Sequence, residues 1–126
     1  MKKLMIIGLL FMLFSLLACA SPTSTHTSIP SMDSSPEMQA KRLNLINKLI
    51  SEGIFYKVEK PGDYAHVWLT PLFHSLDFED KESFVSVVYA YYISRDSKAD
   101  TVILYDSKTG KHIGVYAELY GGLKLD

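Results

Sequence analysis

The N-terminal end limits most what this chain can fold into, because it holds an apolar run too short to cross a membrane. The uncharged run from Leu4 to Leu17 follows Lys2 and Lys3 and has 14 residues, whereas a membrane-spanning helix needs about 20. A charged start, a short apolar stretch and a small residue form the order of a secretory signal peptide. We therefore expect residues 1–18 to be removed, so that only the remainder builds the fold.

The run ends in Leu16, Leu17, Ala18 and Cys19, which resemble the lipobox of bacterial lipoproteins. The resemblance implies that the Cys19 thiol receives a diacylglyceryl group, that the chain is cut just before it and that the freed amine is acylated. Several acyl chains anchor a protein almost irreversibly. Because Ala20 rather than aspartate follows, the resemblance also implies the periplasmic face of the outer membrane, or the cell membrane in a host with one membrane. The alternative is an unmodified thiol in a signal peptide or an uncleaved anchor.

The segment after the lipobox is too polar to fold alone. Residues 19–36 hold the chain's only cysteine, many serines and threonines, and three prolines, and this composition buries little apolar surface. We expect a lipidated, flexible tether here and one domain over residues 37–126. A single cysteine excludes disulfides within the chain, so a packed core must hold the domain. Removal of residues 1–18 moves the formal charge from −1 to −3, and no basic stripe points to nucleic acid.

Hydrophobic spacing predicts two helices in this domain. Ser35 and Pro36 are typical of a helix start, and Gly53 of its end. The second helix follows an acidic segment that suits a helix N-terminus, with Asp77 or Asp80 as its cap. The apolar run after this cap also alternates like a strand, so the sequence leaves a strand open there.

Four strands are expected, at residues 54–60, 65–70, 100–105 and 112–117. Prolines and glycines between them suit the turns of two hairpins, and the tail after Gly121 is either a short edge strand or a strap. We expect an α+β fold of about four mostly antiparallel strands in two hairpins, with two helices packed on one face. The order of a hairpin with a tryptophan, a helix, and a hairpin that carries Asp106, Thr109, Gly110 and Lys111 resembles small uncharacterised domains of bacterial lipoproteins. This resemblance implies no activity.

The candidates for chemistry are His66, His74, Asp77 and Glu79. They offer nitrogen and oxygen ligands to zinc, but the two histidines lack the short paired spacing of zinc sites, and Ser75 is not part of a GxSxG turn. We therefore expect no catalytic residue, no metal and no cofactor. The alternative is an enzyme or small-ligand receptor acting on cell-wall or lipid material, which requires these four side chains to converge in one pocket.

Aromatic residues are the more distinctive feature, since the chain has eight tyrosines. Tyr89, Tyr92 and Tyr116 together with Trp68 are candidates for a partner-binding face, because tyrosine and tryptophan are favoured at interfaces. The alternative is that the tyrosines cover the edge of a small core. We expect a non-enzymatic lipoprotein whose domain binds a protein or another envelope component, with the membrane as its second partner.

Overall fold

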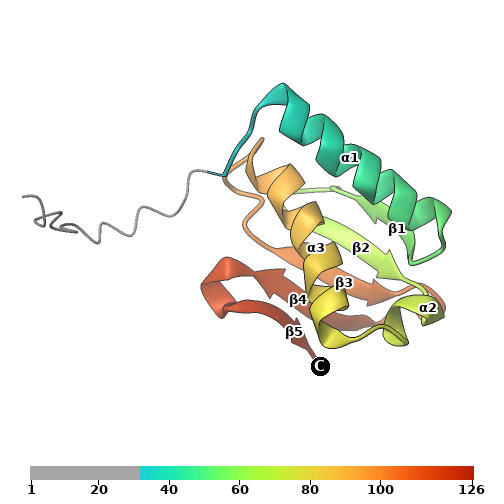
Figure 1. The fold of residues 1–126 in the computed structure, drawn as a ribbon. Helices are drawn as coiled ribbons and strands as arrows, with labels where there is room; N and C mark the ends of the chain where they lie inside the picture. The colour runs from blue at the N-terminus through green and yellow to red at the C-terminus, as the bar shows by residue number, and fades with distance from the viewer. Residues whose placement is uncertain (1–31) are drawn as a thin grey trace, which may run out of the picture. The chain divides into compact units, whose positions relative to one another are not determined.

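A five-stranded sheet forms the centre of the domain, with its strands in the order β1-β2-β3-β4-β5 (Figure 1). The computed structural model describes residues 32–126, so the lipobox with Cys19 and most of the expected tether lie outside the described residues. All neighbouring strands are antiparallel except β2 and β3, which are parallel. The strands are β1 (Phe55–Glu59), β2 (Ala65–Leu69), β3 (Val102–Asp106), β4 (His112–Ala117) and β5 (Gly122–Leu125).

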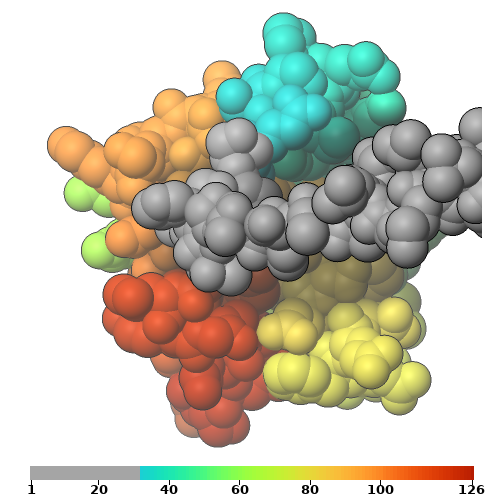
Figure 2. Space-filling model, turned by 60° about the vertical axis from the view of Figure 1, so that its left-hand side comes forward, coloured from blue at the N-terminus to red at the C-terminus, as the bar shows by residue number. Residues whose placement is uncertain are grey.

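Two long helices cover one face of this sheet (Figure 1). They are α1 (Pro36–Ser51) and α3 (Phe78–Ile93), and the short helices α2 (Pro71–His74) and η1 (Glu118–Tyr120) lie in connections. Helix α1 packs on α3 and β1, whereas α3 also contacts β4 and β5. Figures 1 and 2 both place α1 at the end of the domain away from the C-terminal strands. The expected α+β class is confirmed, as are the helices at the two predicted places.

Local sequence explains how α1 begins and ends. The hydroxyl of Ser35 accepts a hydrogen bond from the N–H of Met38 at 3.3 Å, and Pro36 occupies the first turn, where no N–H is needed. Past the last turn, Gly53 adopts a φ of 76°. Its N–H donates to the carbonyl of Ile50 at 3.0 Å, which uses one of the carbonyls that a helix end leaves free.

The domain begins slightly earlier than the expected boundary at residue 37. Met32 packs against the core, and the guanidinium of Arg42 donates to the backbone carbonyl of Asp33 at 2.6 Å. The last residues assigned to the tether therefore belong to the folded unit. Their sequence is polar like the rest of that segment, and composition alone does not reveal these contacts.

The central pairing of the sheet differs from two separate antiparallel hairpins. Ala65 of β2 lies beside Val102 of β3, and the two strands run in the same direction. Parallel neighbours require a long crossover, usually a helix. Helix α3 follows β2 and precedes β3 in the sequence, and it forms this crossover by packing on the sheet. The two predicted hairpins exist, but they join through a parallel pair.

The tail adds a fifth strand, which is one of the two forms the sequence left open. Gly121 and Gly122 adopt φ angles of 81° and 106°, values that favour glycine because it lacks a side chain. They turn the chain so that β5 pairs with β4. The carboxylate of Glu82 on α3 then accepts a hydrogen bond from the N–H of Leu123 at 3.1 Å, which ties the new edge strand to the helix.

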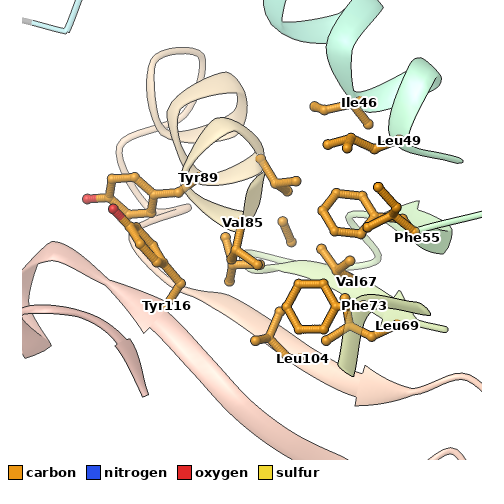
Figure 3. Close-up of a cluster of buried hydrophobic side chains, with 14 of the residues drawn as sticks. Ile46, Leu49, Phe55, Val67, Leu69, Phe73, Val85, Tyr89, Leu104 and Tyr116 are labelled. Atoms are coloured by element: carbon orange, nitrogen blue, oxygen red, sulfur yellow. The ribbon is translucent and has the colours of Figure 1, made fainter. Parts of the chain in front are cut away.

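The core lies between the sheet and the two helices (Figure 3). Its centre is aliphatic and phenylalanine-rich, and the ring centroids of Phe55 and Phe73 are 6.3 Å apart. Figure 3 shows Tyr89 of α3 and Tyr116 of β4 side by side at one end of this cluster. The largest fully buried side chains are those of Phe55, Phe73, Leu49, Leu69, Leu104, Val67, Val85, Val88 and Val102.

Candidate functional site

The sheet face opposite α1 and α3 is the candidate site, and we call it the open face. Side chains of directly opposed residues on neighbouring strands lie on the same face, so the strand register arranges this face in two rows across the sheet. The aromatic row consists of Lys57, Trp68, Tyr105 and His112. The second row consists of Glu59, His66, Ile103, Val115 and Lys124.

Exposure alternates along the central strands, as expected for a sheet covered on one side. Val67 and Leu104 are 0 % exposed and belong to the core. Their neighbours Trp68, Ile103 and Tyr105 are half-buried. Among the described residues, the buried side chains of α1 and α3 pack on the opposite face of the sheet, which we call the covered face. Large aromatic and aliphatic groups of the open face therefore stay in contact with solvent.

The rings of the aromatic row stand beside one another. Trp68 and Tyr105 are stacked with 5.3 Å between their ring centroids and 22° between their planes. His66 contacts both rings, at centroid distances of 5.8 Å and 5.2 Å, and the ring of His112 meets Tyr105 edge-on at 6.1 Å. Since side chains stand roughly perpendicular to a sheet, stacked neighbours turn their faces to each other and their edges outward.

Charged groups border the open face on both edge strands. On β1 the Nζ atom of Lys57 lies 4.2 Å from the centre of the Trp68 ring and 3.5 Å from the carboxylate of Glu59. At the other edge, Nδ1 of His112 on β4 lies 2.8 Å from Oδ2 of Asp126, which follows β5, and the exposed Lys124 lies on β5 itself. The open face therefore has an apolar, aromatic centre and a rim of both charge signs.

The residues expected to bind a partner do not form one surface. Only Trp68 lies on the open face. Tyr89 and Tyr116 are 5 % and 9 % exposed and belong to the core on the other side of the sheet, with ring centroids 5.2 Å apart. Burial raises the pKa of both hydroxyls. Tyr92 is half-buried on α3, where burial also raises its pKa.

The four candidates for chemistry do not share contacts either. His66 contacts the rings of the open face, whereas Nε2 of His74 lies 3.5 Å from Oδ1 of Asp106. Asp77 precedes the first turn of α3, and Glu79 is exposed within that turn. Within residues 32–126, no three His, Cys, Asp or Glu side chains lie close enough together to hold a metal ion. The convergence that the enzyme alternative requires is not found in this part of the chain.

Asp106 has a structural role in the turn after β3. Its carboxylate accepts hydrogen bonds from the N–H and the hydroxyl of Thr109, each at 2.8 Å. These bonds, and to a smaller degree the nearby His74, hold the pKa of the Asp106 carboxyl below its ordinary value. The arrangement orders the hairpin turn that ends at Gly110, which has a φ of 69°.

A separate depression lies between the start of α1 and the end of α3. It has a cavity volume of about 370 Å³ and is lined in part by Gln39, Leu43, Tyr91 and Arg95. Two of its lining side chains bond to Tyr91: Gln39 donates to the backbone carbonyl at 3.0 Å, and Arg95 donates to the hydroxyl at 2.6 Å.

Sequence reasoning missed Tyr105, His112 and Lys57 as members of the site. A signal for Tyr105 was present, because Val102 and Leu104 alternate with Ile103 and Tyr105 in the same way as Val67 alternates with Trp68. Alternation alone does not say which strands lie side by side, however. Only the parallel pairing of β2 with β3 places Tyr105 beside Trp68.

Nothing among residues 32–126 forms a helix long and apolar enough to span a membrane. Comparisons with protein-family models, with curated proteins and with solved structures find no match for this chain.

Proposed function

We propose that this chain is a lipid-anchored lipoprotein whose folded domain is a non-enzymatic binding module, with the open face as the surface that contacts an envelope protein. The observation that carries the proposal is the half-exposed aromatic row on one face of the sheet, with charged side chains at both edges. The proposed location is the periplasmic face of the outer membrane, or the cell membrane if the host has only one.

The anchor part of the proposal rests on the N-terminal sequence. Leu16, Leu17, Ala18 and Cys19 resemble a lipobox, and Ala20 lacks the carboxylate associated with inner-membrane retention. The apolar run before them is shorter than the roughly 20 residues of a membrane span. An acylated Cys19 would hold the domain at a bilayer surface and restrict its encounters to other components of the envelope.

The binding part rests on the composition of the open face. Tryptophan and tyrosine carry a large share of the binding energy in protein interfaces, and charged groups typically form the rim around an apolar centre. Trp68 and Tyr105 lie in the centre of the open face, and Lys57 and Asp126 lie at its ends. This distribution matches the anatomy of a protein interface.

A flat partner suits the open face better than a small ligand. Small-molecule sites are concave and enclose most of the ligand, whereas the aromatic row presents ring edges from neighbouring strands of a sheet. The faces of Trp68 are occupied by Tyr105 on one side and by the ammonium of Lys57. A ligand that stacks on a free ring face, such as a sugar, would have to displace one of these neighbours.

Site-specific photo-cross-linking in intact cells tests the binding function. We expect a photoreactive amino acid in place of Ile103, at the centre of the open face, to give a discrete adduct with an envelope protein. The matched control is the same residue in place of Leu119, which is 87 % exposed and lies in η1, outside both rows. Equal labelling at the two positions, or none at Ile103, would count against the open face as the binding surface.

Metabolic labelling with a palmitate analogue tests the anchor separately. The wild-type chain should carry the label and sediment with the outer-membrane fraction, whereas the Cys19→Ser variant should lose both properties. An unlabelled wild-type chain would reject the lipoprotein assignment while leaving the cross-linking result to be judged by itself.

A further inference from the structure

The charges at the corners of the open face form a self-complementary pattern. Lys57 lies at the β1 end of the aromatic row, and Asp126, which directly follows β5, contacts His112 at the other end of that row. In the second row, Glu59 lies at the β1 end and Lys124 at the β5 end. The sign of the charge therefore alternates around the four corners of the face.

Such a pattern matches itself when two copies of the face are placed against each other. A twofold axis parallel to the strands brings β1 of one copy over β5 of the other and keeps each row opposite itself. Lys57 then faces Asp126 of the second copy, and Glu59 faces Lys124 of the second copy. A twofold axis across the strands brings β1 over β1 and places Lys57 opposite Glu59. Both arrangements bring unlike charges together, and like charges directly opposed would be unfavourable.

The apolar centre of the face is also compatible with twofold symmetry. β3 is the middle strand of the five, so an axis through the centre of the face passes beside Ile103 and Tyr105. In a twofold dimer the same patch is used by both copies. Packed sheets are separated by about 10 Å, a gap that two rows of aromatic and aliphatic side chains can fill.

We propose that a second copy of this chain packs on the open face, so that two lipid-anchored domains form a face-to-face dimer. This inference rests on the proposed function, because it names the occupant of the same surface. The self-complementary charges favour a second copy over an unrelated protein. A twofold dimer requires the charges at the corners of the face to complement one another, whereas binding of an unrelated protein does not.

The size of the face predicts a weak dimer that depends on the anchor. Five strands spaced by about 4.8 Å and five residues of about 3.3 Å each give the face a projected area of about 400 Å². Stable complexes bury about 800 Å² of accessible surface on each partner. Confinement of both copies to one bilayer raises their effective concentration, so the anchored chain should dimerise under conditions in which an unanchored chain is largely monomeric.

The experiment uses full-length, lipidated chains with two different epitope tags, expressed together in the same cells. Photo-cross-linking from Ile103 should give an adduct that carries both tags. Lys57→Glu should lower the yield of this adduct about tenfold, which corresponds to about 1.4 kcal/mol, because the introduced carboxylate would face another carboxylate under either axis. Lys48→Glu is the matched control, since it makes the same charge change on α1, where Lys48 is exposed beside Glu52.

Two charge exchanges then identify the axis. Lys57→Glu with Asp126→Lys should restore the adduct if the axis runs along the strands. Lys57→Glu with Glu59→Lys should restore it if the axis runs across them. Resistance to protease digestion, measured for every variant, separates a lost interface from a lost fold.

The outcomes distinguish this inference from the proposed function. An adduct from Ile103 that contains a different protein and never both tags would overturn the dimer and leave the binding function standing. Failure of both charge exchanges in protease-resistant variants would also overturn the dimer. A face that gives no adduct at all would reject both proposals.

Discussion

The two faces of the sheet are built from adjacent residues of the same strands, yet they have different chemistry. On β2 the covered face holds Val67, which is fully buried, and the open face holds the half-buried Trp68. The covered face is aliphatic and closed by α1 and α3, whereas the open face is aromatic with a charged rim. The difference indicates that stability resides mainly on the covered face, which leaves the open face available for the binding that we propose.

The largest effect is expected from truncating the covered face. Leu104→Ala should lower the free energy of unfolding by about 2–5 kcal/mol, because it leaves a cavity beside fully packed neighbours. Its matched control is Ile103→Ala, one residue earlier on β3 but on the open face, where about 1 kcal/mol is expected. Urea denaturation of both variants measures the difference. Equal losses would contradict the division of roles between the faces.

A smaller effect is expected where the covered face meets the last strand. Gly122 has a φ of 106°, and a Cβ there would collide with the carboxylate of Glu82. Gly122→Ala should therefore cost about 1–3 kcal/mol of unfolding free energy. Gly62→Ala is the control, because no atom lies within 4 Å of the Cβ that it adds. A neutral Gly122→Ala would show that β5 is not fixed in the way described.

Trp68 sharpens the comparison from the open face. Trp68→Ala should change the free energy of unfolding by only about 1 kcal/mol, the scale of a cross-strand pair, and should abolish cross-linking from Ile103. The adjacent Leu69→Ala, on the covered face, should cost about 2–5 kcal/mol. Thermal unfolding combined with cross-linking yield checks both. A large loss of stability with normal cross-linking in Trp68→Ala would reverse the roles that we assign.

The smallest effect at neutral pH is expected from the two buried tyrosines. Burial raises the pKa of Tyr89 and Tyr116 in the folded state, so in alkali the unfolded chain loses these protons first. Their contribution to stability is present below the unfolded pKa of about 10 and is lost as the pH rises through the folded values. Denaturation at a series of pH values should show this fall. The double variant Tyr89→Phe, Tyr116→Phe should lose less unfolding free energy over the same rise in pH. An unchanged pH dependence would argue against burial of these two hydroxyls as the cause of the fall.

Features set by neighbouring residues could be predicted from the sequence. The start of α1 follows from Ser35 and Pro36, because an N-cap and a first-turn proline act within one turn of the chain. The placement of Trp68 and Val67 on different faces of the sheet follows from the strand period of two. These are short-range effects, and distant parts of the fold do not alter them.

Features that depend on long-range packing could not be predicted. The parallel pairing of β2 with β3 depends on how α3 crosses the sheet. The sequence of neither hairpin by itself determines that crossing. Tyr89 and Trp68 are similar in size and polarity, and only the orientation of their elements makes one a core residue and the other part of the open face. Counting aromatic residues therefore suggested a docking surface but selected two buried tyrosines for it.

The pairing of Ala65 with Val102 also has a consequence for the time at which the chain folds. Contacts between residues far apart in sequence form slowly, because a long loop must close before they are made. The middle of the sheet cannot assemble until β3 has been synthesised and has met β2, and β5 comes later still. The domain therefore gains its central strand pair only after most of the chain has been made.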